Sequence, residues 1–336
     1  MPPKKIVTLR AVAEKAGTSI QTVSTVLNDS RSNTVVSAET RARILMVANE
    51  MQYRRNALAR SIRRGYTNII GFYSGYGAVS QSNPFIAEVF GGIREGCNEH
   101  RKDLLIHGTY RGNSVDDIYN ELTSGKIDGL VMFSPKDDNL ARRLKLAPLP
   151  VVAIAEMVSG ATSLIMDDID GGCQALRHLR DLGHRHVLYR YSTAPFVSAQ
   201  RRLDGIVSEA SLWDIRITPV AETDDYFSLS DYEKVLLKSK SSARPTAVVC
   251  WCDASAETIL QFLFDNDISV PDQMAVVGFD GLKLPYVNGA NLTTLVAPWA
   301  DVGRRAVSIL ASDEADHAHE ANVIILPMHL RRGNTT

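Results

Sequence analysis

Apolar residues recur at helical spacing near the start of the chain and give way to short β-branched runs further on. The apolar positions of two helices predicted within residues 8–28 are Val12, Ala13 and Ala16, then Val23, Val26 and Leu27. The two stripes can bury against each other, with Gly17 supplying the permissive backbone of the corner between them. The pattern therefore predicts two short helices joined by a tight turn.

A third helix is predicted from Ser37, which can serve as its N-cap, to about Met51. We expect Ala38, Leu45, Ala48 and Met51 on its buried side. Three helices in some fifty residues provide a small but sufficient core.

The other face of the second predicted helix carries short side chains or side chains that form hydrogen bonds. It consists of Ile20, Gln21, Thr22, Ser24 and Thr25, with Ser19 at its start and Asn28 at its end. Such side chains suit a DNA major groove, where they can contact base edges and phosphates. The stretch predicts a helix-turn-helix reader of DNA, and a generic two-helix corner is the alternative.

From residue 68 onward, apolar runs rich in β-branched residues alternate with helix-like segments. The predicted strands are 68–73, 104–108, 129–133, 151–154, 186–191, 247–251 and 274–279, and the predicted helices include 86–100, 116–124, 176–182 and 254–264. This alternation is typical of parallel strands with crossover helices. Two such series predict two α/β lobes, and because no nucleotide fingerprint is complete, we expect a hinged clamp around a small ligand.

Charge divides the chain at the same place. Residues 1–66 carry twelve Lys and Arg against four Asp and Glu, a net charge of +8, and the remaining 270 residues carry 25 against 34, a net charge of −9. A basic head on an acidic body favours phosphate binding by the head alone. No apolar run reaches the length of a membrane span, and the first residues, MPPKKIVTL, lack a signal-peptide core. We therefore expect a cytoplasmic protein that does not enter a membrane.

The four cysteines do not have the spacing of zinc ligands. They are Cys97, Cys173, Cys250 and Cys252, and the last two alternate along an apparent strand. Reduced, structural cysteines are expected, with a redox or metal role of the Cys250 pair as the alternative. We expect no cofactor.

A basic segment, residues 53–65, joins head and body. Asn56 is a good N-cap, and Ala59 and Ile62 fall on one face of a helix too short to be stable alone. Two copies packed on DNA would order it, with Ile62 wedged between base pairs of the minor groove. A basic linker helix without insertion is the alternative. The DNA-contacting residues expected overall are Ser19, Ile20, Gln21, Thr22, Ser24, Thr25, Asn28, Tyr53, Asn56, Ala59 and Ile62.

Several side chains follow predicted strands, where open α/β lobes bind their ligands. We expect the cleft residues to be Phe85, Glu156, Arg202, Trp251 and Asp280. A guanidinium and a carboxylate can fork onto neighbouring hydroxyls while aromatic faces cover C–H surface, a combination that suits a sugar. The alternatives are that Phe85 and Trp251 belong to the lobe cores, and that Arg202 and Asp280 form a structural ion pair.

The chain resembles the lactose-repressor/galactose-repressor (LacI-type) transcription regulators throughout its length. The stretches that carry the resemblance are TLRAVAEKAGTSIQTVSTVLN, VSAETRARI, Y-x-x-NALARSIRRG, NPF with IAEVFGGI, KIDGLVMFSP, LPVVAI, LRDLGHRHV, QRRLDG, VPDQMAVVGFDG and ILPMHL. The resemblance implies a body like a periplasmic sugar-binding protein, joined by three crossing strands, with ligand-binding roles for Phe85, Arg202 and Asp280. Thr25, Arg55, Ile62 and Cys252 depart from the family pattern, which leaves the operator sequence and ligand open.

These observations together predict a helix-turn-helix headpiece (1–52), a hinge (53–66) and an α/β body (67–336) of two doubly wound parallel-sheet lobes. The N-lobe is expected at about 67–167 and 296–318, and the C-lobe at about 168–295 and 319–333. We expect a homodimeric repressor that binds a pseudo-palindromic double-stranded DNA operator and responds to a small-molecule effector, most simply a carbohydrate. A cleft controlled by a protein partner or a purine-type ligand is the alternative.

Two other classes fit less well. A solute-binding protein would need a signal peptide and no basic head. An enzyme would need a catalytic set, and His178, His184 and His186 near Asp181 lack a nucleophile or metal-ligand spacing.

Overall fold

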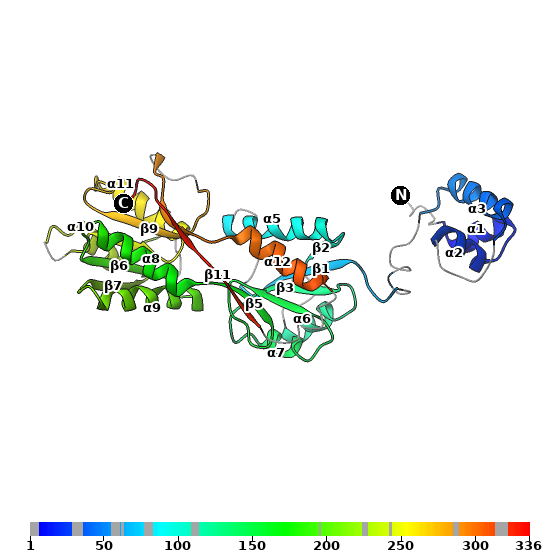
Figure 1. Ribbon diagram of the computed structural model, residues 1–336, viewed down its shortest axis with the longest axis horizontal. Coiled ribbons are helices and arrows are strands. Elements are labelled where there is room, and N and C mark those ends of the chain that lie inside the picture. Colours follow the sequence, from blue (N-terminus) through cyan, green and yellow to red (C-terminus); the bar gives the residue numbers. More distant parts are fainter. Residues whose placement is uncertain are drawn as a thin grey trace. The chain divides into compact units, whose positions relative to one another are not determined.

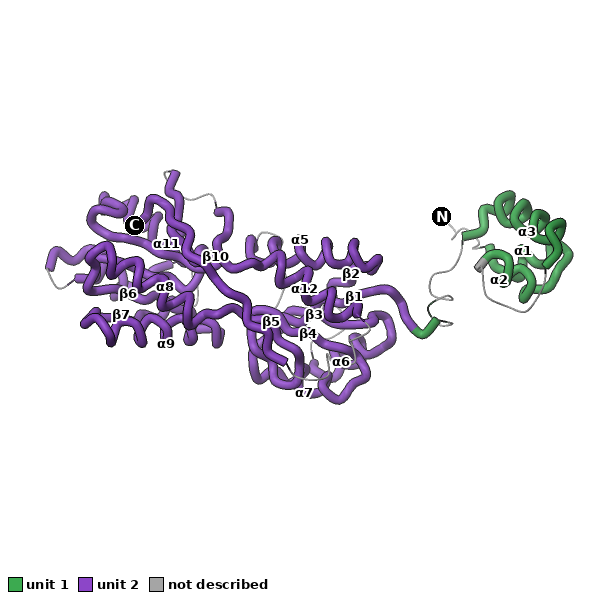
Figure 2. The backbone as a smooth tube through the Cα atoms, viewed as in Figure 1, with its two compact units in different colours: residues 1–65 green, residues 66–336 purple. Residues whose placement is uncertain are grey.

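The computed structural model of the chain contains two compact units, residues 1–65 and residues 66–336 (Figure 2). The residues that it describes are 7–28, 36–54, 61, 64–76, 83–108, 114–194, 196–223, 228–241, 244–284, 289–312 and 322–336.

The first unit has a core formed by three helices, as the sequence predicts: α1 (Leu9–Ala16), α2 (Ile20–Asn28) and α3 (Ala38–Glu50). Thr8 caps α1 by accepting a hydrogen bond from the Ala11 amide, and Gly17 ends the helix with a left-handed φ of 62°. Ser37 caps α3 in the same way through the Thr40 amide. The apolar stripes of α1 and α2 are buried against each other and against α3.

The buried face of α3 differs from the prediction at two positions, because Ala38 is exposed and Ile44 takes the place expected for Leu45. Ile44, Val47 and Ala48 are buried, whereas Leu45 is 50% exposed. Ile44 and Leu45 are adjacent and apolar, and only one of them can face the small core. The i, i+3, i+4 spacing of Ile44, Val47 and Ala48 selects Ile44.

The N-lobe of the body is built on a parallel sheet in the order β11-β5-β4-β3-β1-β2. Its strands are β1 (Ile69–Ser74), β2 (Asp103–Ile106), β3 (Gly129–Phe133), β4 (Val151–Ile154), β5 (Thr162–Met166) and β11 (Val323–Leu326). Its helices are α5 (Pro84–Glu99), α6 (Val115–Leu122), α7 (Asn139–Leu144) and α12 (Trp299–Ala311). Helices α5 and α12 lie side by side (Figure 1), and a Cβ atom at Gly92 would come within 1.8 Å of the Ala300 carbonyl oxygen.

The C-lobe repeats this architecture around a sheet in the order β12-β10-β9-β8-β6-β7, in which only β12 is antiparallel to its neighbour. Its strands are β6 (His186–Tyr191), β7 (Arg216–Ala221), β8 (Ala247–Cys250), β9 (Ala275–Asp280), β10 (Thr293–Val296) and β12 (His329–Arg331). Its helices are α8 (Asp168–Asp181), α9 (Val197–Ser211), α10 (Asp231–Lys238) and α11 (Asp253–Asp265). The prediction of two doubly wound lobes is confirmed.

The chain passes between the lobes three times, after β5, after β10 and between β11 and β12 (Figure 1). The predicted lobe boundary near residue 319 is wrong, because β11 pairs with β5 and so extends the N-lobe to Leu326. The predicted C-lobe end at 333 is also too early, because Thr335 is buried and donates a hydrogen bond from its hydroxyl to the Val276 carbonyl oxygen.

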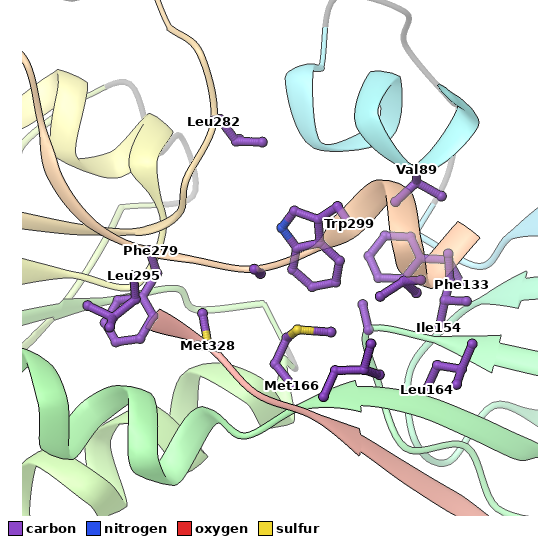
Figure 3. Close-up of a cluster of buried hydrophobic side chains, with 14 of the residues drawn as sticks. Val89, Phe133, Ile154, Leu164, Met166, Phe279, Leu282, Leu295, Trp299 and Met328 are labelled. Carbon is purple, nitrogen blue, oxygen red and sulfur yellow. The ribbon is translucent and has the colours of Figure 1, made fainter. Parts of the chain in front are cut away.

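One hydrophobic cluster continues across both lobes (Figure 3). It runs from Phe133 and Ile154 in the N-lobe, through Trp299 and Met328 at the crossings, to Phe279 in the C-lobe. The strand ends that face the other lobe are therefore supported by continuous packing. In the ranges described above, no helix combines the length and apolar character needed to cross a membrane.

Candidate functional site

The start of α2 presents short polar and apolar side chains on the surface of the first unit. Ser19, Ile20 and Gln21 are exposed, with Ile20 43% exposed. The Ser19 hydroxyl accepts a hydrogen bond from the Thr22 amide at 3.0 Å, which fixes the first turn of the helix. This turn can approach base edges without a long side chain in the way.

The prediction that Ser24 and Thr25 lie on the exposed face is wrong for this structure. Both are buried, and the Thr25 hydroxyl donates to the Gln21 carbonyl oxygen at 3.0 Å. Residues 23–27 are all buried, whereas the prediction assumed one open face along the whole helix.

The remaining predicted DNA contacts are only partly described. Tyr53 packs in part against the core of the first unit. Asn28 is the last residue of α2, and its side chain lies outside the described part. Asn56, Ala59 and Ile62 also lie outside the described residues.

In the body, the predicted cleft residues gather where the carboxyl ends of the two sheets meet. Glu156 follows β4, Trp251 follows β8, and Asp280 ends β9, while Arg202 lies on α9. Asp168, the first residue of α8 after β5, joins them and is not among the predicted cleft residues. Its only sequence signal is its position directly after an apolar run, where a helix-starting aspartate is also common.

Arg202 is held by groups from three elements. Its Nε donates to Asp168 Oδ1 at 2.9 Å, its Nη1 donates to the Trp251 carbonyl oxygen, and its Nη2 lies 3.6 Å from Asp280 Oδ1. Burial opposes the charge of Arg202, but the carboxylates of Asp168 and Asp280 outweigh that effect and raise its pKa. The structure thus brings together Arg202, Trp251 and Asp280, as predicted, and adds Asp168.

Asp280 occupies an unusual position. Burial raises its pKa to about 7, and the nearby Asp168 carboxylate acts in the same direction, while Arg202 and the Trp299 indole favour the charged form. Its φ of 107° is rare for a residue other than glycine, which marks local backbone strain.

Glu156 connects the two lobes. Its carboxylate, fully buried, accepts hydrogen bonds from the amides of Val197 and Ser198, each at 3.2 Å, and from the Ser198 hydroxyl at 2.7 Å. The N-cap residue of α9, Phe196, supplies no side-chain hydrogen bond of its own. A carboxylate of the N-lobe therefore caps a helix of the C-lobe, and burial raises its pKa.

A series of aromatic rings also crosses between the lobes. Consecutive ring centroids in it lie 4.6 to 5.3 Å apart, in the order Trp299, Phe85, Phe133, Tyr76, Phe196 and Trp251. Phe85 and Trp251, the two predicted aromatic residues, thus stand near opposite ends of one series. Each is partly buried and packs against the core. Each ring can therefore belong to the lobe core and still present a face to a ligand.

A buried network of charged side chains holds the indole of Trp251 through a hydrogen bond. The Trp251 Nε1 donates to Glu222 Oε2 at 2.8 Å, and Glu222 Oε1 accepts from Arg190 Nη1 at 2.7 Å. Arg190 is completely buried in β6 and also donates to Glu233 at 2.7 Å. The signal for this network is a charged residue inside the otherwise apolar strand 186–191.

The histidines and cysteines have local roles. His178, His184 and His186 each pair at 2.8 Å with a different threonine, namely Thr336, Thr246 and Thr218. Burial raises the pKa of the Cys250 thiol to about 12 and that of Cys252 well above its usual value, which keeps both neutral. The described segments contain no group of three or more His, Cys, Asp and Glu placed to hold a metal ion.

Known proteins resemble this chain along almost its entire length. The family model of bacterial regulatory proteins, lacI family, matches residues 8–56, and the periplasmic binding protein-like domain matches residues 176–336. The HTH-type transcriptional repressor PurR of Aliivibrio fischeri (strain MJ11) is 30% identical over 325 residues, covering 94% of each chain. The ribose operon repressor of Haemophilus influenzae is 29% identical over 313 residues, covering 90% of each chain.

Solved structures show the same fold. The lac repressor dimer bound to operator and the anti-inducer ONPF superposes with a TM-score of 0.81 at 24% identity, covering 99% of both chains. The transcriptional regulator CelR–cellobiose complex superposes with a TM-score of 0.67 at 22% identity, covering 98% of this chain and all of that one.

Proposed function

The chain belongs to the lacI family of bacterial regulatory proteins, and from this we propose that it is a repressor that binds a pseudo-palindromic operator as a homodimer. We propose further that a small molecule bound between the lobes alters operator affinity. One observation carries the proposal: a three-helix DNA reader and a two-lobed body, whose strand ends meet around Arg202 and Asp280, occur in one chain. Because the proposed operator is part of the bacterial chromosome, the proposal includes a cytoplasmic location.

On the DNA side, we assign base reading to the exposed first turn of α2, with Gln21 as the side chain best able to form two hydrogen bonds to a base. The net charge of +8 in residues 1–66 supplies the phosphate attraction. Tyr53, Asn56, Ala59 and Ile62 remain our proposed hinge contacts in the minor groove.

On the ligand side, we propose a carbohydrate. Arg202 and Asp280 offer a donor and an acceptor side by side, and the aromatic series offers flat faces for C–H surface. The names of a ribose operon repressor and a cellobiose-bound regulator among the similar proteins support this class. A purine base is the second candidate, because a flat ring can stack beside Phe196 and Trp251, whose rings lie 5.1 Å apart.

The coupling we propose acts through lobe closure. Glu156 and the aromatic series join the lobes directly, and the crossing strands carry any change of lobe angle through the shared core. A ligand can shift this equilibrium only through different affinity for the two lobe arrangements.

The test is selection of DNA by the full-length chain from a random double-stranded library. The proposal predicts enriched sites made of two inverted half-sites, because a twofold dimer presents two copies of α2. A matched control is Gln261→Ala, which changes an exposed glutamine of α11 and should enrich the same sites. Enrichment of single half-sites, or of no sequence, would contradict the proposal.

A further inference from the structure

Three buried polar atoms of the body have no hydrogen-bond partner among the described residues. They are the Tyr76 hydroxyl, the Ser134 hydroxyl and Arg201 Nη1. A fourth such atom, Trp299 Nε1, faces the Asp280 carboxylate and favours its charged form, so its orientation has a reason within the protein. Buried polar groups are nearly always paired, and each unpaired one in a folded protein calls for an explanation.

The segments that carry these three atoms meet between the lobes, where Tyr76 packs against Phe196 and Glu156 binds the first turn of α9. Tyr76 and Ser134 follow the neighbouring strands β1 and β3, in which Ser74 pairs with Phe133, so both lie at the same edge of the N-lobe sheet. The Tyr76 ring lies between those of Phe133, at 4.6 Å, and Phe196, at 4.8 Å.

Glu156 is the common neighbour of this place. Burial raises the pKa of Tyr76, and the charge of Glu156 raises it further. Arg201, on α9 of the C-lobe, is close enough for its charge to lower the pKa that burial gives Glu156. The unpaired atoms of Tyr76 and Arg201 thus come from different lobes and lie near the same buried carboxylate.

The charges at this place exclude a class of ligands. The positive charges of Arg202 and Arg201 are balanced inside the protein, because Arg202 lies against Asp168 and Asp280 and Arg201 directs its Nε and Nη2 to Asp168. Nη1 of Arg201 is left to bind a ligand. Phosphate and carboxylate groups are bound best by several charged donors at once, and here they would also approach Asp168, which Arg201 contacts, and Glu156.

We propose that Tyr76, Ser134 and Arg201 form a recognition set for an uncharged, hydroxyl-rich ligand, and that the cleft rejects phosphorylated and carboxylated forms of the same ligand. Each of the three supplies a single hydrogen-bonding position, which matches separate hydroxyl oxygens. The inference rests on the proposed effector function and deepens it by naming the ligand's charge class and three residues that select it.

The experiment measures binding of matched compounds to the full-length chain by calorimetry and by the shift of the thermal midpoint. The panel consists of glucose, glucosamine, glucose 6-phosphate and glucuronate, together with ribose and ribose 5-phosphate, and cellobiose. We expect saturable binding by at least one uncharged member, and binding about 100-fold weaker or absent for its phosphorylated or carboxylated counterpart.

Tyr76→Phe then separates ligand recognition from a structural role. Because the hydroxyl has no partner among the described residues, its removal should leave the thermal midpoint without ligand unchanged or higher. The same change should weaken binding of the uncharged ligand about tenfold. Tyr232→Phe, at an exposed position of α10, is the matched control and should change neither quantity.

Each outcome has a distinct meaning. Saturable binding of a phosphorylated or carboxylated compound at least as tight as that of its uncharged counterpart would overturn the inference and leave the proposed function standing. Unchanged affinity in Tyr76→Phe would overturn the recognition set. A chain that selects an operator but binds no compound of the panel would contradict the proposed carbohydrate response, and the inference with it.

Discussion

Removing the Glu156 carboxylate should loosen the contact between the lobes, because Phe196, the N-cap residue of α9, supplies no side-chain hydrogen bond of its own. In Glu156→Ala the amides of Val197 and Ser198 lose their acceptor. Leaving a buried donor unpaired costs about 1–3 kcal/mol, so two donors place the loss at about 2–6 kcal/mol. Burial of the carboxylate itself destabilises the folded chain and raises its pKa. Glu156→Ala removes that cost, so we expect a net loss of stability near the lower end of the range, about 2 kcal/mol.

Hydrogen–deuterium exchange of the full-length chain measures this effect at the affected amides. A loss of about 2 kcal/mol corresponds to about 30-fold faster exchange at Val197 and Ser198. Ser114→Ala is the matched control, because Ser114 caps α6 within the N-lobe by accepting from the Asp117 amide at 3.1 Å. It should speed exchange in α6 only.

Equal protection of Val197 and Ser198 in the wild type and Glu156→Ala would refute the reasoning. It would mean that water or another group replaces the carboxylate without loss, and that Glu156 does not hold the lobes together.

Three further predictions concern single side chains. Gln21→Ala should relax base preference at one position of each half-site by about 1–3 kcal/mol, measured with single-base operator variants, and an equal loss on all sequences would limit Gln21 to phosphate contact. Because the pKa of Asp280 is raised from 3.8 to about 7, the folded chain retains a proton that the unfolded chain loses, so unfolding free energy should fall as pH rises across this range. Asp280→Asn should flatten that dependence in denaturant titrations, and parallel curves would show that another group controls it. Glu222→Gln should increase acrylamide quenching in a Trp213→Phe background, where Trp251 is the more exposed of the two remaining tryptophans, because its indole loses a charged acceptor. Unchanged quenching would mean that packing alone holds the ring.

The local elements of this protein could be read from its sequence because their signals are local. Ser37 and Gly17 mark helix ends by chemistry that acts within three residues, and both were identified. Helix α9 had no such signal, since its cap is Glu156, 41 residues earlier in the chain and in the other lobe. Strand β11 was placed in the wrong lobe because its pairing with β5 joins positions about 160 residues apart.

The candidate site was foreseen in part for a similar reason. Residues that follow strands, such as Trp251 and Asp280, obey a rule of position. Asp168 and Tyr76 also follow strands, but their roles depend on which neighbours the fold supplies. Asp168 pairs with Arg201 and Arg202, whereas the Tyr76 hydroxyl has no partner in the described part of the chain. Thr25 is the opposite case: helical spacing predicts that its side chain contacts DNA, but the packing of the small headpiece buries it.

The measurement that tests the central claim most directly is a pair of titrations on one preparation of the full-length chain. Operator affinity is measured with and without saturating ligand, and ligand affinity is measured with and without saturating operator. The account predicts that both affinities change by the same factor, about 5- to 150-fold, because coupling between two binding sites is reciprocal. A ligand that binds the cleft at saturation and leaves operator affinity unchanged would contradict it.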